Sequence, residues 1–241
     1  MTEFKLFRLS HLNSLNRATP SRRFVLCLAE EAVSKGIGEQ AGGHLNIRTQ
    51  SSILARQCSL KALEQLQGVL VSLSEVITDA DGVPTWPKPY LGSLSHTYLC
   101  DESKIVAVAL MAESSSEIHG VGVDIETKSP RAFTVRKKIL TPGELDWVER
   151  SEERATRLFG AKEAIYKAVF PTVRRFFGFH EAELQSVNDR GHWTCEPYRH
   201  LDMGEFKLIP REALTWPSDA PQTLETLWLD IEGFSVSIAL W

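Results

Sequence analysis

The chain contains few cysteines, and their spacing suits neither a zinc site nor a disulfide framework. The four cysteines, Cys27, Cys58, Cys100 and Cys195, are scattered and form no C-x-x-C pair. Zinc modules and small disulfide-rich domains both depend on closely spaced cysteines. Widely separated thiols are typical of proteins in a reducing compartment. We therefore expect a cytoplasmic protein without a structural zinc ion.

The chain also lacks long apolar runs and an excess of basic residues. The longest apolar run, residues 105–112, is far shorter than the roughly 20 residues that a membrane-spanning helix needs. Residues 1–6 show no basic segment followed by a long apolar stretch, so we expect no secretory signal. The formal net charge is −4, which argues against a broadly basic nucleic-acid surface. Neither a membrane nor a nucleic acid is expected as a partner.

The 241 residues suit one large domain or two small ones. Apolar periodicity and turn residues predict helices at 24–34, 50–66 and 154–169. Alternating and β-branched segments predict strands at 4–9, 69–77, 104–111, 120–126, 184–187, 192–196, 227–231 and 234–240. The proline-rich stretch 210–221 predicts an extended surface excursion.

The segment 159–168, FGAKEAIYKA, predicts an amphipathic helix with a lysine on its apolar face. At ~100° per residue, Lys162 falls in the centre of the apolar stripe, with Glu163 and Lys167 along one edge. A buried ammonium needs an anion or loses its proton, so we expect an anionic ligand, first of all a phosphate. Two ordinary alternatives stay open. Glu163 and Lys167 can form a solvated pair, and Lys162 can extend to solvent along its methylenes.

The segment 120–126, GVGVDIE, predicts a strand with two carboxylates on one face. Asp124 and Glu126 are then ~7 Å apart and repel each other unless a cation or water separates them. Such oxygen ligands suit Mg²⁺. A D-x-E strand alone could equally be an acidic edge strand. Followed by K-E-x-x-x-K on a helix, it offers three carboxylates for a metal and two ammoniums for phosphates.

These two segments, together with residues 86–97, WPKPYLGSLSHT, resemble the motifs of 4'-phosphopantetheinyl transferases of the surfactin- and enterobactin-synthase type. Such enzymes move the phosphopantetheine arm of coenzyme A to a serine of an apo acyl or peptidyl carrier protein and release adenosine 3',5'-bisphosphate. The resemblance implies an α+β fold of pseudo-twofold duplicated halves, each a small antiparallel sheet with a long helix. Coenzyme A would bind in the cleft between an N-terminal half, 1–115, and a C-terminal half, 116–241, of a monomer.

The resemblance also implies a Mg²⁺-dependent mechanism in the C-terminal half. Asp124, Glu126 and Glu163 would hold Mg²⁺ against the pyrophosphate of coenzyme A. Lys162 and Lys167 would neutralise the phosphate oxygens as the carrier serine attacks. Glu163 is also the candidate general base, directly or through a metal-bound water.

Further coenzyme A contacts are implied in the N-terminal half. In the W-P block, Ser93, Ser95 and His96 are expected to form a phosphate-facing turn. Trp86 is expected to be a packing anchor. Lys88 is a plausible phosphate contact that could equally be solvated, and an isolated histidine more often caps a turn.

Arg48 and Arg56 resemble the basic segment that meets the 3'-phosphate in related enzymes. The sequence departs from the family pattern at two positions: Ala55 stands where a glycine is usual, and Gly160 where serine is common. A glycine inside a helix costs roughly 1 kcal/mol relative to alanine, and could be retained where a backbone or ligand passes close.

Carrier proteins are generally acidic around their modified serine, so we expect a basic rim beside the cleft. Two clusters are candidates, the first preferred because it follows the D-x-E strand: Arg131, Arg136, Lys137 and Lys138, or Arg174 with Arg175.

Two other functions remain open. A metal-dependent phosphohydrolase uses similar groups, but it usually adds tight His and Asp metal motifs that the sequence does not show. A non-catalytic module that binds coenzyme A or a carrier domain would not need the set of Asp124, Glu126, Glu163 and Lys167.

Overall fold

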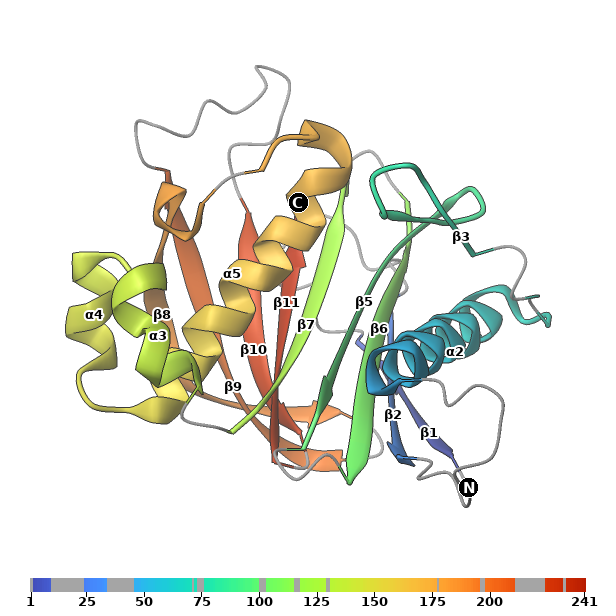
Figure 1. Cartoon of the computed structure of the whole chain (residues 1–241), viewed down its shortest axis with the longest axis horizontal. Coiled ribbons are helices and arrows are strands. Elements are labelled where there is room, and N and C mark those ends of the chain that lie inside the picture. Colours follow the sequence, from blue (N-terminus) through green and yellow to red (C-terminus); the bar gives the residue numbers. More distant parts are fainter. Residues whose placement is uncertain are drawn as a thin grey trace.

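A computed structural model describes residues 2–9, 24–33, 46–70, 72, 76–99, 103–114, 118–128, 131–176, 178–195, 198–210, 224–231 and 233–241. The described part is a mixed α/β fold with two main antiparallel sheets, each covered by one long helix (Figure 1). This confirms the expected fold class. No helix in the described part is long and apolar enough to cross a bilayer.

The first sheet and its helix come from the N-terminal part of the chain. In spatial order its strands are β1 (Glu3–Arg8), β2 (Phe24–Ala32), β6 (Lys104–Glu113) and β5 (Tyr90–Tyr98). Helix α2 (Ile47–Gln67) packs on β2, β5 and β6. It begins where the Asn46 side chain accepts a hydrogen bond from the amide of Thr49, and it ends at Gly68, whose φ is +75°. Strands β3 (Ile77–Thr78) and β4 (Pro84–Thr85) form a separate small hairpin.

The second sheet comes from the C-terminal part. Its strands, in spatial order, are β7 (Val121–Thr127), β11 (Phe234–Leu240), β10 (Glu225–Ile231), β9 (Tyr198–Pro210) and β8 (Ala182–Cys195). Helix α5 (Glu152–Val173) lies over β7, β10 and β11 (Figure 1). The remaining helices pack at one side: α3 (Arg131–Ile139), α4 (Pro142–Val148) and the 3₁₀ turn η2 (Phe179–Glu181).

Three apolar clusters hold these layers together. One lies between α2 and the first sheet, and a second lies between α5 and the second sheet. The third cluster joins the other faces of both sheets, with side chains such as Leu28, Val108, Val123 and Ile238. Because both sheets contribute side chains to this third cluster, its packing fixes the position of one sheet relative to the other.

Several predicted elements agree with the structure and two do not. Residues 24–34 were predicted to be helical, but residues 24–32 form β2, a central strand paired with β1 and β6. Its first six side chains, Phe24–Ala29, are all buried. A short strand that is buried on both faces has no alternation of apolar and polar residues, so the sequence pattern does not identify it as a strand. The strand predicted at 69–77 is wrong for Val69 and Leu70, which lie outside any strand, while Ile77 begins β3; residues 71 and 73–75 lie outside the described part.

In the second half, the strands predicted at 184–187 and 192–196 fall in one longer strand, β8, except for residue 196, which lies outside the described part. The pairing of β8 to β9 has register shifts. Strand β9 had no counterpart among the predicted elements. The predicted excursion 210–221 lies outside the described residues except for Pro210, which ends β9. The predicted boundary at residue 115 falls between β6 and β7, and the duplication of halves, the two-domain division and the monomeric state stay predictions.

Candidate active site

Helix α5 and strand β7 lie in backbone contact because β7 carries a glycine where they meet. A Cβ on Gly122 would collide with the carbonyl oxygen of Ala164 and lie 2.8 Å from the amide nitrogen of Ala168. Only a residue without a side chain allows a helix to approach a strand so closely. This contact brings Asp124, two residues further along β7, beside Lys167 of α5.

Asp124 and Lys167 form the centre of the site. Lys167 Nζ lies 2.7 Å from Asp124 Oδ1 and also donates to the Val123 carbonyl at 3.2 Å. Ser95 Oγ of β5 donates to the same Oδ1 at 2.8 Å. Asp124 is only 4% exposed, and its other oxygen, Oδ2, is buried without a hydrogen-bond partner among the described residues. A buried carboxylate oxygen left without a partner is costly, and it marks a place where a cation or water would bind.

Glu126 and Glu163 lie in the electrostatic field of Asp124. Burial, followed by the negative charge of Asp124, raises the pKa of Glu126 to about 8; Lys167 and Arg131 oppose this shift. Burial and Asp124 also raise the pKa of Glu163, again opposed by Lys167. Glu126 and Glu163 therefore resist ionisation beside Asp124, and a cation close to these two glutamates would favour their charged forms.

The oxygen ligands of this cluster suit a hard divalent cation, but the carboxylates do not converge on one point. Asp124, Glu126 and Glu163 were predicted as the metal ligands, and the structure brings them to one region. Within the described residues, however, no three His, Cys, Asp or Glu side chains converge closely enough to hold a metal ion. Lys167 is bonded to one of the Asp124 oxygens instead. The metal-binding role of these residues therefore stays a prediction.

Lys162 is buried, as the apolar stripe predicts, but its partners belong to the protein. It is 3% exposed, and its Nζ lies 2.9 Å from Glu144 Oε2. It also donates to the carbonyl oxygens of Phe179 and Ala182, each at 2.6 Å. With its ammonium directed to three protein oxygens, Lys162 is supported as a structural residue rather than as the predicted phosphate contact.

Glu144 is the buried anion that the sequence reading missed. It lies at the first turn of α4, where it forms a capping box with Thr141, and its Oε1 accepts the amide of Leu184 at 2.8 Å. The T-P-G-E segment 141–144 carries the signal of a capped helix start. It carries no signal that the glutamate pairs with Lys162, which lies on another helix.

A pocket of about 190 Å³ opens beside Glu163. Most of its wall is apolar, and Tyr166 contacts both Phe170, with ring centroids 5.1 Å apart, and Phe176, at 5.8 Å. The described residues that line it are Lys162, Glu163, Tyr166, Phe176, Gly178, Phe179 and Ala182. Periodicity marked Tyr166 as part of the apolar stripe of α5, but no sequence signal indicated that η2 would complete a pocket there.

The Ser93–His96 segment is not the predicted turn. It lies within β5, where Ser93 and Ser95 project from one face and are both buried. Ser93 Oγ accepts the amide hydrogen of Val123 at 3.0 Å, and Ser95 donates to Asp124. The hydroxyl groups therefore contact β7 rather than facing an open phosphate site. The turn prediction failed because small polar residues are typical of loops. Here Ser93 and Ser95 are alternate residues of a strand, and both bond to the neighbouring sheet.

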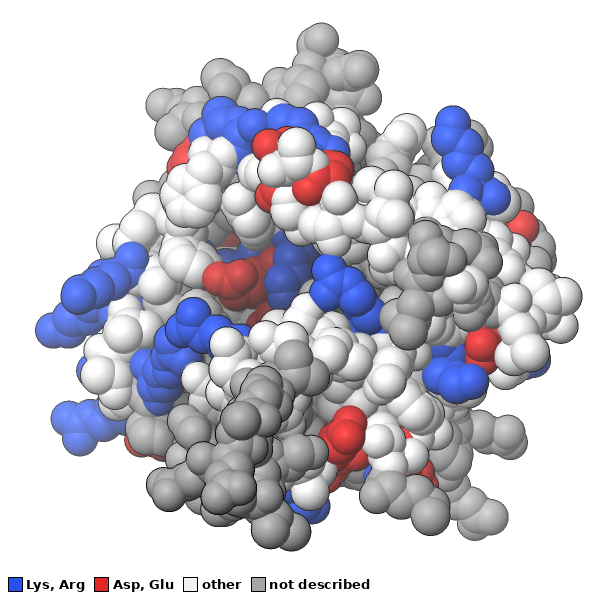
Figure 2. Space-filling model, turned by 45° about the vertical axis from the view of Figure 1, so that its right-hand side comes forward, with Lys and Arg blue, Asp and Glu red and all other residues white. Residues whose placement is uncertain are grey.

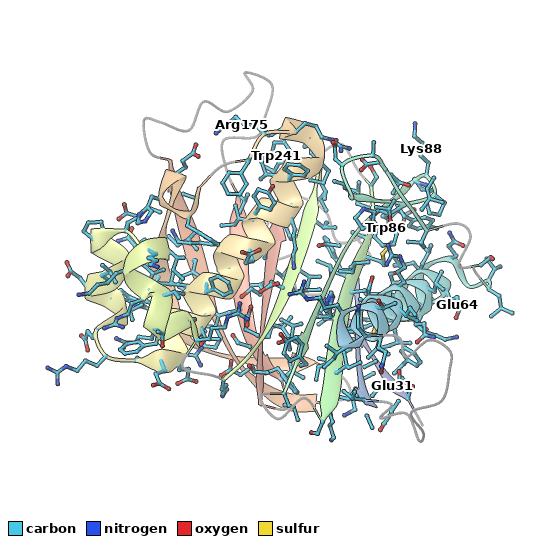
Figure 3. The ribbon with its side chains drawn as sticks, in the orientation of Figure 1. Glu31, Glu64, Trp86, Lys88, Arg175 and Trp241 are labelled. Atoms are coloured by element: carbon cyan, nitrogen blue, oxygen red, sulfur yellow. The ribbon has the colours of Figure 1, made fainter. Side chains whose placement is uncertain are left out.

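Trp86 agrees with expectation, whereas the role of His96 as a coenzyme A contact stays a prediction. Burial and the nearby Lys167 lower the pKa of His96, while Asp124 opposes the shift. The imidazole therefore lies within the electrostatic field of the site, although the residue is exposed to solvent. Trp86 packs against the cluster under α2 and donates from Nε1 to the Gly92 carbonyl at 2.8 Å, which confirms it as a packing anchor (Figure 3).

The three remaining predicted coenzyme A contacts lie on α2 and in the turn before β5. Arg48 is exposed in the first turn of α2. Arg56 bonds to Ser52 Oγ at 2.5 Å and to Thr78 Oγ1 at 2.9 Å. Lys88 is exposed and extends away from the body of the protein (Figure 3). Their roles as coenzyme A ligands stay predictions.

The basic clusters differ in how far they are neutralised. Arg174 pairs with Asp79 at 2.7 Å and with Asp81 at 2.9 Å, and Arg175 pairs with Glu181 at 3.0 Å. In α3, Lys137 and Lys138 are exposed, Arg136 lies over the ring of Phe133, and Arg131 is close enough to Glu126 to lower its pKa. Figure 2 shows acidic and basic side chains that meet in a recess near the centre of the face in view. Further basic side chains lie around this recess.

Comparison with known proteins finds similarity to one family, and the family model matches the segment that carries Asp124, Glu163 and Lys167. The sequence model of the 4'-phosphopantetheinyl transferase superfamily matches residues 120–206. Npt of Nocardia iowensis, a 4'-phosphopantetheinyl transferase, is 31% identical over 140 residues, which is 57% of this chain and 59% of that protein. The 4'-phosphopantetheinyl transferase PptT of Mycobacterium tuberculosis is 31% identical over 151 residues, 61% of this chain and 62% of PptT.

A third relative, the 4'-phosphopantetheinyl transferase Svp of Streptomyces mobaraensis, is 33% identical over 120 residues, 47% of this chain and 46% of Svp. The matched segments thus span about half to three fifths of the length of these relatives. The matched residues 120–206 include the D-x-E strand β7 and the K-E-x-x-x-K helix α5. Through this segment, the chain is similar to the 4'-phosphopantetheinyl transferase superfamily.

Proposed function

We propose that this protein transfers the 4'-phosphopantetheine arm of coenzyme A to a serine of an apo acyl or peptidyl carrier protein, with release of adenosine 3',5'-bisphosphate. The observation that carries the proposal is the Asp124–Lys167 pair with Glu126 and Glu163 in its field, built within the segment that matches the superfamily. The W-P block resembles that of the surfactin- and enterobactin-synthase type, and we assign the protein to that type.

Lys167 is our candidate for the phosphate contact. Its side chain is 27% exposed, so it reaches solvent while remaining bonded to Asp124. A compact ammonium can neutralise the nonbridging oxygens of a pyrophosphate. His96, in the field of the same lysine, would contribute a second contact from the opposite sheet.

We infer that Asp124, Glu126 and Glu163 would hold Mg²⁺. The raised pKa values of Glu126 and Glu163 and the partnerless Oδ2 of Asp124 support this assignment, because a cation would relieve all three. When bound, Mg²⁺ supplies charge neutralisation for the phosphoryl group that is transferred.

Glu163 is our candidate general base. A base works best when its pKa approaches the working pH, and burial beside Asp124 moves the pKa of Glu163 upward in that direction. Its side chain also borders the apolar pocket. That pocket would accommodate the uncharged arm of coenzyme A, so that the phosphate at its end lies near Lys167 and Glu163.

The carrier protein would dock beside α3. Lys137 and Lys138 are exposed there, whereas Arg174 and Arg175 are already paired with carboxylates. Reversing both charges with Lys137→Glu and Lys138→Glu should slow carrier capture and reduce its salt dependence, because the long-range attraction to an acidic carrier is lost. Coenzyme A affinity should not change. Loss of that affinity instead would place these lysines in the nucleotide site.

One assay tests the proposed function against its two rivals. The protein is incubated with coenzyme A, Mg²⁺ and an apo-carrier domain, and the carrier is weighed by mass spectrometry. A carrier that gains one phosphopantetheine supports the transferase. Free phosphopantetheine with an unmodified carrier would identify a phosphohydrolase, and binding without either product would identify a non-catalytic module.

We place the activity in a reducing cytosol and in a monomer. The free, buried thiols of Cys27 and Cys58 support the first assignment. The second follows from the paired helix-and-sheet layers, since each chain supplies both sides of the site.

A further inference from the structure

The two sheets meet at strands that end their respective ladders. In the described structure β5 is the last strand of the first sheet and β7 is the last strand of the second, and the two strands pack against each other. Such edge strands present backbone amides and carbonyls that have no partner within their own sheet. A buried amide at this junction therefore needs a hydrogen bond from the opposite side.

Ser93 supplies that bond for the strand that carries the D-x-E motif. Its Oγ accepts the amide hydrogen of Val123 at 3.0 Å, and its side chain is buried. Val123 itself packs into the core shared by both sheets. A side-chain hydroxyl thus takes the place of the carbonyl that would accept this amide if the two sheets were continuous.

Ser95, two residues further along β5, bonds to the next residue of β7. Its Oγ donates to Asp124 Oδ1 at 2.8 Å, and this oxygen also accepts from Lys167. Ser93 and Ser95 point the same way because side chains alternate along a strand. One pair of serines therefore holds both the backbone and the carboxylate at the centre of the site.

We propose that Ser93 and Ser95 are positioning residues that lock the N-terminal sheet to Asp124, and that their hydroxyls are not ligands of coenzyme A. Each hydroxyl is buried and already bonded to β7. Ser93 sets the position of the β7 backbone, and Ser95 restricts rotation of the Asp124 side chain. The two halves are thereby coupled, because a displacement of β5 moves the carboxylate that the other half contributes. Only the consequence for catalysis rests on the proposed function.

Amide exchange measured by NMR tests Ser93 without any reference to activity. In Ser93→Ala, exchange of the Val123 amide should accelerate about tenfold relative to Leu229, a buried residue of β10 that reports global opening. Ser95→Ala should leave the Val123 amide within about twofold of the wild type, because its bond goes to a side chain. Ser59→Ala, which removes a buried hydroxyl bonded within α2, is the matched control. Unchanged Val123 exchange in Ser93→Ala would overturn the role of Ser93.

A double-mutant cycle tests the bond between Ser95 and Asp124. Ser95→Ala should lower the folding equilibrium constant about tenfold in the wild type but less than about twofold in an Asp124→Ala background. Equal effects in the two backgrounds would show that the hydroxyl does not act through Asp124.

Carrier labelling separates a positioning role from a ligand role. Ser95→Ala should raise the half-saturating Mg²⁺ concentration about tenfold, while the Kd of coenzyme A, measured by calorimetry, stays within about twofold. Ser95→Thr, which keeps the hydroxyl, should recover most of the loss. A weakened coenzyme A affinity with unchanged Mg²⁺ dependence would make Ser95 a coenzyme A ligand and overturn the proposal. If the wild type labels no carrier, the proposed function fails, whereas the exchange and unfolding measurements still decide the coupling.

Discussion

The two helix-and-sheet layers of this protein use opposite chemistry. Under α2, the sheet presents an apolar face that includes Val25, Cys27, Ala107 and Ala109, all of them buried. Under α5, strands β7, β10 and β11 carry buried polar side chains: Asp124, Thr226, Ser235 and Ser237. Buried polar groups lower the stability of a fold unless they are paired. The polar face under α5 therefore lowers folding stability, whereas the apolar face under α2 does not.

The polar side chains of the α5 layer lie in register. Ser237 of β11 is opposite Asp124, and Ser235 is opposite Glu126. Thr226, Ser235 and Ser237 each have a buried hydroxyl without a partner in the described structure. A Cβ on Gly160 would lie 2.9 Å from Ser237 Oγ and 3.5 Å from Asp124 Oδ2, so this glycine keeps α5 close to the polar row. The comparison teaches that one layer provides stability, while the other gives up some of it to hold a charged site.

The largest expected difference between the layers concerns two lysines. Lys162→Met should lower the free energy of unfolding by about 3–5 kcal/mol, because it leaves the buried Glu144 without its cation. Lys61→Met in α2 removes a partly exposed pair with Glu64 and should cost less than about 1 kcal/mol. Urea denaturation measures both. Equal effects would show that the Lys162–Glu144 pair is not a structural requirement of the α5 layer.

Two glutamates provide the second comparison. Glu163→Gln should reduce the rate of carrier labelling at least about 100-fold if it removes the general base and a metal ligand. Glu64→Gln, at a similar place on the surface of α2, should leave the rate unchanged. Labelling is followed by mass spectrometry at saturating Mg²⁺, with circular dichroism as the folding control. A rate for Glu163→Gln within about threefold of the wild type would contradict both roles.

A pair of glycines tests how closely each layer is packed. Gly122→Ala should destabilise the protein by about 1–3 kcal/mol and reduce labelling, because its Cβ would meet the α5 backbone, which can only move with the whole helix. At Gly92 in β5 the nearest atoms belong to the side chains of Met111 and Trp86. Since methionine adapts easily, Gly92→Ala should cost less than Gly122→Ala. Thermal unfolding measures both variants. A smaller loss of melting temperature for Gly122→Ala than for Gly92→Ala would show that α5 can shift on β7.

The last comparison concerns a pH dependence that belongs to the α5 layer. The pKa of Glu126 is raised from 4.5 to about 8, so the folded state binds this proton more firmly than the unfolded state does. Its contribution to stability is therefore complete at low pH and is lost as the pH rises from about 5 to about 8. Without divalent ions, Glu126→Gln should flatten this decline in urea denaturation. A decline of equal slope in the variant would assign it to other groups, Glu163 first among them, since its pKa is raised too.

Local patterns were sufficient for the elements that carry the chemistry. The period of α5 placed Lys162 in an apolar stripe, and the alternation of β7 placed Asp124 and Glu126 on one face of the strand. Strand β2 could not be found in this way, because a central strand covered on both faces shows no alternation. The α2 layer is accordingly the part in which a helix was predicted where a strand lies.

Motif spacing and periodicity thus determined that the D-x-E carboxylates lie on a strand and the K-E-x-x-x-K groups on a helix. The partners of those residues came from chain folding: Glu144 beside Lys162, Ser95 beside Asp124, and η2 beside Glu163. Each of these contacts joins segments that are distant in sequence or lie on different elements. Periodicity describes one element at a time, and a hydrogen bond between two elements exists only after packing has brought them together.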